Sequence, residues 1–233
     1  ENHIIIGHAQ DHKRVFDHDQ GDNTGGMGCS TPPLLITSEI ETKIETEIFE
    51  RTFTGLYDEH RPYKGVLYLG GMITKDGEIY VIEFNARWGD PEAQVILPGL
   101  MGDFYEMSMS VSNGDITKIN ISMDSISRVV VAGVSRGYPG NYDTVKGERV
   151  HGLEEARKVS GVKVYGAGIK VVDGVNTAVG GRLFYIVGEG ENVIEARERA
   201  YRAMDLVSID GNNLHYRTDI GYRDVKRING TKR

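Results

Sequence analysis

The chain has 233 residues, the length of one large domain or two small ones, and its 27 Lys and Arg residues against 34 Asp and Glu residues give a formal charge of −7. A composition of 39% apolar and 26% charged residues is that of a globular protein with a core and argues against disorder. An acidic chain has no overall field that attracts nucleic acid or an anionic membrane, so we expect neither as a partner. The single Cys29 excludes an internal disulfide, and no apolar run approaches the ~20 residues of a membrane span. We therefore expect a soluble, cytoplasmic protein.

In the first quarter of the chain, short apolar runs alternate with polar segments. Ile4–Ile6 predicts the end of a buried strand, and the polar segment Asp11–Gly28 predicts a long loop of the kind that is usually functional in a compact domain. A capping-box pattern at Ser38–Glu41 accompanies isoleucines at four-residue spacing over Ile40–Ile48. This combination predicts a helix over about Glu39–Tyr57.

A β-hairpin and a second helix are predicted next. The strands are Lys64–Thr74 and Glu78–Asn85, joined by the turn Lys75–Gly77, because Asp-Gly is a strong hairpin signal. Residues Pro98–Ser112 predict a helix that ends at Asn113-Gly114.

We place a domain boundary near Asp124, where the chain becomes polar and a strand-rich pattern follows. Strands are predicted at Arg128–Val134, Val162–Val172 and Arg182–Val187. An apolar stripe predicts an amphipathic helix between Asn192 and Val207; it consists of Val193, Ala196, Ala200, Met204 and Val207. The predicted domains are 1–124 and 125–233, and the second ends in a frayed tail over Asn229–Arg233.

The stretch from Val81 to Pro98, VIEFNARWGDPEAQVILP, carries the most chemical information. Side chains two residues apart share one face of a strand, so Glu83, Asn85 and Arg87 are expected to point together. A carboxylate and an amide oxygen suit Mg²⁺, which usually keeps substrate phosphates in its shell, and an arginine can grip a phosphoryl group. This pattern is typical of phosphoryl transfer, although a solvated edge strand is the alternative. The polar turn that follows, Gly89–Glu92, favours binding because dense polar residues between apolar runs are costly.

The segment Arg87–Val95 closely resembles the signature of the phosphoribosylamine–glycine ligase family, with Trp88 where that family usually has Leu or Phe. Further segments that resemble the family occur in the family's order along almost the whole chain. They are Gln10–Arg14, Asn23–Gly28, Lys64–Tyr68, Gly137–Pro139, Gly180–Arg182 and Tyr216–Gly221. In one turn the chain departs from the family, because Gly166 and Ile169 replace a His and a Thr.

The resemblance implies an α+β protein: the second half of an ATP-grasp domain, with an antiparallel sheet and helices, followed by a small strand-rich C-terminal domain. It implies the reaction of ATP, glycine and 5-phosphoribosylamine to ADP, phosphate and glycinamide ribonucleotide, a step of de novo purine biosynthesis, through a glycyl phosphate. Glu83 and Asn85 would be the ligands of Mg²⁺ or Mn²⁺. Arg87 would be the catalytic residue that neutralises charge on the transferring phosphoryl group.

The resemblance also implies a set of substrate-binding residues. They are Asp11, Lys13, Asn23, Thr24, Gly25, Gly26, Met27, Gly28, Asp90, Glu92 and Arg182. Gly25, Gly26 and Gly28 would let backbone N–H groups form an anion nest, and Asp90 and Glu92 would hold a substrate amine or ribose hydroxyls. The alternatives are a flexible turn for the glycines, a solvated charge for Lys13 and a structural ion pair for Arg182. Cys29 is interpreted as a small buried residue rather than a nucleophile.

The family carries a long N-terminal portion, with the first half of the ATP-grasp domain, that does not precede Glu1 here. We therefore expect the missing N-terminal half of the same polypeptide as a partner, and we expect this chain by itself neither to bind ATP tightly nor to turn over. Two other hypotheses stay open: another ATP-grasp ligase or carboxylase, and a non-catalytic scaffold fragment. Intact Glu83, Asn85 and Arg87 argue against the scaffold.

Overall fold

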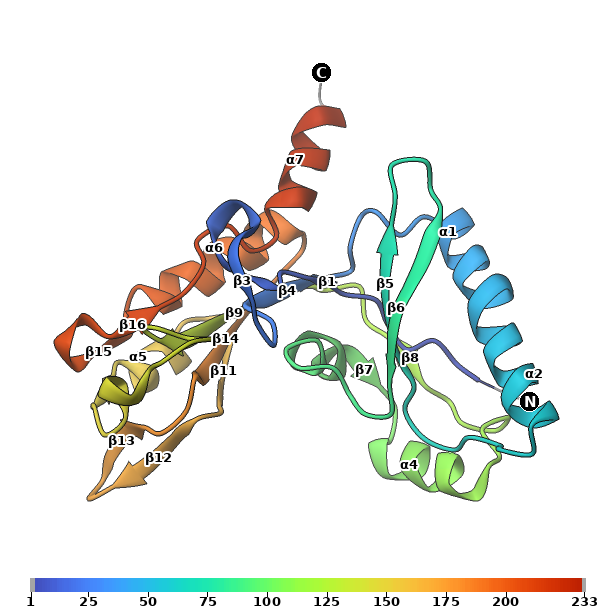
Figure 1. The fold of residues 1–233 in the computed structure, drawn as a ribbon, viewed down its shortest axis with the longest axis horizontal. Helices are drawn as coiled ribbons and strands as arrows, with labels where there is room; N and C mark the ends of the chain where they lie inside the picture. Colours follow the sequence, from blue (N-terminus) through green and yellow to red (C-terminus); the bar gives the residue numbers. More distant parts are fainter. Residues whose placement is uncertain (1–2, 232–233) are drawn as a thin grey trace. The chain divides into compact units, whose positions relative to one another are not determined.

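The computed structural model describes residues 3–231, which divide into two compact units (Figure 1). Unit 1 holds the chain up to residue 7, together with 34–89 and 100–124. Unit 2 holds 8–33, 90–99 and the chain from 125 onward. One division between the units falls at 124/125, and the domains expected from the sequence, 1–124 and 125–233, stay a prediction. Segments 8–33 and 90–99 belong to unit 2, and strand pairing joins the first of them to the sheet of that unit.

The main sheet of unit 2 is antiparallel and has the strand order β1–β4–β9–β14–β11, with β16 paired to β9. Its strands are β1 (Gln10–Asp11), β4 (Gly28–Thr31), β9 (Ser127–Ser135), β11 (Val162–Gly166), β14 (Arg182–Gly190) and β16 (Leu214–His215). The central strands β9 and β14 confirm the strands predicted over 128–134 and 182–187. Their register places Val131 opposite Ile186.

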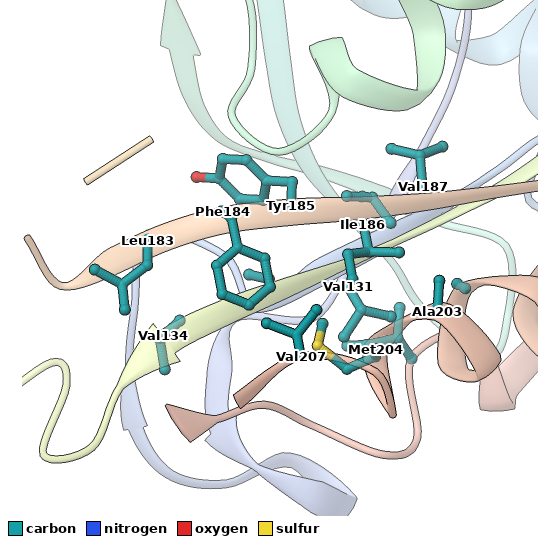
Figure 2. Packing of buried hydrophobic residues seen from close by; sticks show 14 of the residues in the cluster. Val131, Val134, Leu183, Phe184, Tyr185, Ile186, Val187, Ala203, Met204 and Val207 are labelled. Carbon is teal, nitrogen blue, oxygen red and sulfur yellow. The ribbon is translucent and has the colours of Figure 1, made fainter. Parts of the chain in front are cut away.

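The core of unit 2 forms where α6 (Val193–Met204) packs on β9 and β14. Figure 2 shows Phe184 and Val131 from the sheet with Met204 of the helix region, and all three are buried. Asn192 caps the helix by accepting hydrogen bonds from the N–H groups of Ile194 and Glu195. The predicted apolar stripe is confirmed, since all five of its members are buried.

One predicted strand, 162–172, is two strands in the structure. After β11 the chain turns, and the N–H groups of Ala167 and Gly168 donate to the carbonyls of Leu183 and Arg182. The following β12 (Ile169–Val172) then pairs with β13 (Val175–Ala178) in a separate hairpin. The glycine-rich turn therefore redirects the chain within the predicted run.

The predicted long loop at 11–28 is also wrong, because β2 (Arg14–Phe16) and β3 (Gln20–Asn23) form a hairpin there and β4 follows. Likewise the predicted tail is helical as far as it is described, since α7 spans Tyr222–Thr231; its last two residues lie outside the described chain.

The smaller elements of unit 2 are η1 (Asp17–Asp19), α3 (Ala93–Ile96), η3 (Leu97–Gly99), η4 (Asp143–Val145), β10 (Val150–His151), α5 (Leu153–Arg157), β15 (Ser208–Ile209) and η5 (Asp210–Asn212).

Unit 1 contains one long helix, which confirms the prediction over 39–57. It runs through α1 (Ser38–Lys43), the π-helical η2 (Ile44–Phe49) and α2 (Glu50–Asp58). The cap is Thr37 rather than Ser38, because the Thr37 hydroxyl accepts from the N–H of Ile40 at 3.3 Å.

The predicted hairpin of unit 1 is confirmed as β5 (Tyr68–Ile73) and β6 (Ile79–Asn85). The second helix, α4 (Phe104–Asn113), begins later than predicted, because β7 (Leu100–Met101) pairs with β8 (Ser122–Met123) before it. It ends at the left-handed Gly114, as predicted. Ile4–Ile6 form no strand, so that prediction is wrong.

Across residues 3–231, none of the helices combines the length and apolar character that crossing a membrane requires.

Gly188 allows α6 to lie directly on β14, because a Cβ there would be 2.0 Å from the carbonyl oxygen of Ala196. We predict that Gly188→Ala lowers the free energy of unfolding of unit 2 by about 2 kcal/mol, since the helix must move away from the sheet. Gly230→Ala is the control, because open space surrounds that helical position and the change should cost less than about 0.5 kcal/mol. Urea denaturation followed by circular dichroism measures both, and an unchanged midpoint for Gly188→Ala would contradict the prediction.

Candidate functional site

The hairpin of unit 1 presents Glu83 and Asn85 on one face. Their cross-strand partners are Gly70 and Tyr68, and the register is regular between these two pairs. Because alternate residues of a strand share a face, the two polar side chains lie together, as expected from the sequence. Glu83 leans over Gly70, where a Cβ would be 3.1 Å from the Glu83 Cγ.

Arg87 does not continue this row on the strand. β6 ends at Asn85, and the chain bends before Arg87. Of the three residues expected on one strand face, only Glu83 and Asn85 therefore lie on the strand. The exposed Arg87 guanidinium donates from Nη1 to the carbonyl of Trp88 at 2.8 Å. Its remaining N–H groups leave it able to bind a phosphoryl group.

The polar side chains on β6 are suitable ligands for a hard cation. Glu83 is exposed and offers a carboxylate, while the Asn85 Nδ2 is buried without a hydrogen-bond partner in the described chain. Rotation of an amide by 180° exchanges its oxygen and nitrogen, so this position can equally present the Asn85 oxygen. A carboxylate and an amide oxygen are ligands that Mg²⁺ accepts, with water and phosphate oxygens completing the shell.

A second group of predicted residues comes together in unit 2 around a buried carboxyl. The Asp11 Oδ1 accepts from the N–H of His12 at 2.7 Å, and the Lys13 ammonium lies 3.0 Å from Oδ2. Burial, with the nearby charge of Glu92, raises the pKa of Asp11 to about 6, against the opposing effect of Lys13. Asp11 therefore exchanges its proton near neutral pH.

Arg182 forms the structural ion pair that the sequence analysis gave as an alternative, and it also donates hydrogen bonds to two backbone carbonyls. Its Nη2 lies 3.1 Å from the Asp90 Oδ2, while Nη1 donates to the carbonyls of Gly25 at 2.9 Å and Asp90 at 2.8 Å. Arg182 thus joins the 25–26 turn to the 90–92 turn within unit 2.

The predicted anion nest is not formed by residues 24–27. The N–H of Thr24 donates to the carbonyl of Lys13, that of Gly25 to the Tyr138 hydroxyl, that of Gly26 to the Thr24 hydroxyl and that of Met27 to the carbonyl of His12. The loop therefore uses these four donors for its own structure.

Close packing explains two of the loop's glycines instead. A Cβ on Gly26 would be 2.5 Å from Pro91 Cδ, and one on Gly28 would be 2.3 Å from the carbonyl oxygen of Val130. Met27 is fully buried in the core, whereas Asn23 is exposed. Among the predicted loop side chains, Asn23 and Lys13 are both exposed.

Two tyrosines that the sequence analysis did not select contact these residues. The Tyr138 hydroxyl accepts the Gly25 N–H at 3.1 Å, and Tyr185 lies near the Asp90 carboxylate, whose charge helps to raise the pKa of the Tyr185 hydroxyl. Tyr138 belongs to a segment that resembled the family, so a signal for it existed, but Tyr185 has the sequence pattern of a core residue. The interpretation of Cys29 is confirmed, since it is buried and burial raises the pKa of its thiol.

The antiparallel sheet with helices is consistent with the α+β ATP-grasp fold, and structural comparison assigns the chain to that fold. The solved structure of phosphoribosylamine–glycine ligase from Thermotoga maritima matches this chain with a TM-score of 0.80 and 34% identity, over 94% of this chain and 52% of that one.

Family comparison identifies the chain more closely. The pattern described as Phosphoribosylglycinamide synthetase, ATP-grasp (A) domain, matches residues 1–93, and the pattern described as Phosphoribosylglycinamide synthetase, C domain, matches residues 128–223. The chain belongs to the phosphoribosylglycinamide synthetase family.

Two curated relatives illustrate the extent of the match. Phosphoribosylamine--glycine ligase of Caldanaerobacter subterraneus subsp. tengcongensis is 41% identical over 220 residues, or 94% of this chain and 51% of that protein. Trifunctional purine biosynthetic protein adenosine-3 of Bos taurus is 41% identical over 218 residues, or 93% of this chain and 21% of that protein. The chain thus spans about half the length of the bacterial relative and a smaller share of the bovine one.

The raised pKa of Asp11 can be tested with two variants that should shift it in opposite directions. Carboxyl NMR should show Asp11 titrating near pH 6. Glu92→Gln should lower this midpoint because it removes a repelling charge, and Lys13→Met should raise it because it removes an attracting one. Since the folded protein holds the Asp11 proton more tightly than the unfolded chain, its stability should fall as pH rises from 4 to 6, and less so in Asp11→Asn. A midpoint near 4 in the unmodified protein would contradict the assignment.

Proposed function

We propose that the chain is the C-terminal part of an ATP-dependent ligase that joins glycine to 5-phosphoribosylamine, a step of purine biosynthesis in the cytoplasm. The observation that supports this proposal is the continuous likeness, through both units, to curated proteins named phosphoribosylamine–glycine ligase. An oxygen of the glycine carboxylate attacks the γ-phosphorus of ATP and ADP leaves. The amine of phosphoribosylamine then attacks the acyl carbon of glycyl phosphate, phosphate leaves, and the new amide nitrogen loses a proton.

In this proposal the unit 1 hairpin serves the phosphates. Glu83 and Asn85 hold Mg²⁺ or Mn²⁺, which when bound neutralises charge on the ATP phosphates. Arg87 contributes a fixed positive charge for the transferring phosphoryl group, in which charge spreads over the three equatorial oxygens. The N–H groups of Arg87 beyond its contact with Trp88 are available for this role.

The unit 2 residues bind the other substrates. Asp90 and Glu92 accept hydrogen bonds from N–H or O–H groups of a substrate. Asp11, whose carboxyl group pairs with the Lys13 ammonium in this structure, pairs instead with a positively charged group of the substrate. Asn23 and Thr24 offer side-chain hydrogen bonds to the ribose or phosphate, while Gly25, Gly26, Met27 and Gly28 shape the loop. Arg182 fixes that loop against Asp90.

We further propose that the N-terminal half found in the relatives covers an apolar surface of unit 1. Ile82 on β6 is 66% exposed, and Tyr80 and Phe84 of the same strand are exposed as well. Further exposed apolar side chains of unit 1 are Tyr57, Met72, Val81, Met101, Phe104, Tyr105 and Met109. Monomeric proteins rarely leave so many large apolar residues open, and a β-hairpin needs further cover for stability.

The function is tested by joining the chain to the segment that precedes it in its relatives and measuring ADP release. We predict release that depends on glycine and 5-phosphoribosylamine, is abolished by a metal chelator and does not need bicarbonate. Glu83→Gln should lower kcat by about 100-fold or more, because it removes the negative charge of the carboxylate ligand and weakens metal binding. Glu78→Gln, a change at an exposed residue just before β6, is the control and should keep full activity. A bicarbonate requirement would indicate a carboxylase, and the absence of any ADP release would indicate a scaffold.

The 233-residue chain by itself should not bind ATP tightly, because in the relatives this chain corresponds to only about half of the protein. Isothermal titration with Mg-ATP is the measurement. Low-micromolar affinity for the isolated chain would contradict this prediction without affecting the one on Glu83.

A further inference from the structure

Arg182 contacts two separate segments of unit 2, the 25–26 turn and Asp90, through one guanidinium. Besides its ion pair with Asp90, its Nη1 donates to the carbonyls of Gly25 and Asp90 and lies 3.4 Å from that of Gly26. Its side chain is only 20% exposed. A planar fork of donors suits several fixed acceptors at once, whereas a lysine ammonium serves them as a point charge. Arg182 is therefore committed to the protein's own acceptors.

Asp90 is held from several directions and yet stays open to solvent. Its Oδ2 meets Arg182, and its Oδ1 accepts from the Gln94 Nε2 at 3.1 Å. Tyr185 lies near it, and burial together with the Asp90 charge raises the pKa of this tyrosine, so its hydroxyl keeps its proton. The Asp90 side chain is nevertheless 45% exposed. A carboxylate fixed in orientation with half its surface free is an acceptor for donors on a ligand.

The Gly25 peptide is held by its two polar groups. Its carbonyl accepts from Arg182, and its N–H donates to the Tyr138 hydroxyl at 3.1 Å. A Cβ on Gly25 would be 2.9 Å from the Arg182 Nη2, so the guanidinium lies directly against the backbone. Tyr138 is itself fixed by Gly181, where a Cβ would be 2.4 Å from the Tyr138 ring.

We infer that Arg182 and Tyr138 are positioning residues that hold the Gly25 peptide and the Asp90 carboxylate, so that Asp90 accepts the amine or hydroxyl donors of a non-nucleotide substrate. The identity of that substrate, glycine or 5-phosphoribosylamine, rests on the proposed function. Neither residue needs to touch it. Pre-fixing an acceptor in this way favours binding because less conformational freedom is lost when the ligand arrives.

The first test needs no turnover. In the polypeptide joined to its upstream half, Tyr138→Phe should accelerate amide hydrogen exchange of Gly25 by about tenfold, because the hydroxyl that accepts its N–H is removed. Tyr142→Phe is the matched control, since the Tyr142 ring lies 6.2 Å from that of Tyr138 while the Gly25 N–H bonds to Tyr138. Unchanged Gly25 exchange in Tyr138→Phe would overturn the inference for this tyrosine.

The second test separates positioning from a general structural role. Arg182→Met should raise the KM of glycine or of 5-phosphoribosylamine by about tenfold, with the KM of ATP unchanged, because Asp90 loses its ion pair. Arg182→Lys should fall between this variant and the unmodified enzyme, because lysine keeps the charge but not the fork. Equal changes in all three KM values together with a lower melting temperature would overturn the inference.

The failure of this inference and that of the proposed function are distinguishable. An unmodified joined polypeptide without glycine-dependent ADP release would refute the ligase proposal, whereas the Gly25 exchange rates would still decide whether the tyrosine holds the loop.

Discussion

The pairing of β4 with β9 is the constraint on which the unit 2 site depends. It joins residues about 100 positions apart, with Gly28 opposite Val131 and Thr31 opposite Arg128. The two strands approach so closely at Gly28 that any Cβ would meet the carbonyl oxygen of Val130. Since β14 lies on the other side of β9, this pairing also brings the 25–26 turn within reach of Arg182.

A buried arginine anchors the same N-terminal segment a second time. Arg217 is fully buried, and it lies 2.7 Å from an oxygen of Asp219 and 3.0 Å from one of Asp19, while donating to the carbonyl of Arg14. Breaking a buried ion pair leaves an uncompensated charge, which makes such a contact specific even where its net contribution to stability is small. The β2–β3 hairpin is therefore fixed at its tip by Asp19 and at its end by the sheet.

Local patterns were sufficient wherever the deciding contacts are close in sequence. The Asp-Gly turn at 76–77, the stripe facing β14 and the Asn113-Gly114 helix end all appear in the structure as predicted. At the candidate site, alternation on β6 predicted the shared face of Glu83 and Asn85. It did not predict the bend before Arg87, because the end of a strand depends on where its partner stops pairing.

The sequence by itself determined the family, the order of its motifs and most of the regular elements, because residue spacing and turn chemistry are local properties. Only the tertiary structure showed that 8–33 pack with the second unit and that the loop N–H groups are already occupied. It also identified Tyr138 and Tyr185 as neighbours of Gly25 and Asp90. These features depend on hydrogen bonds and close contacts between residues far apart in the chain, and no local pattern specifies which distant groups will meet.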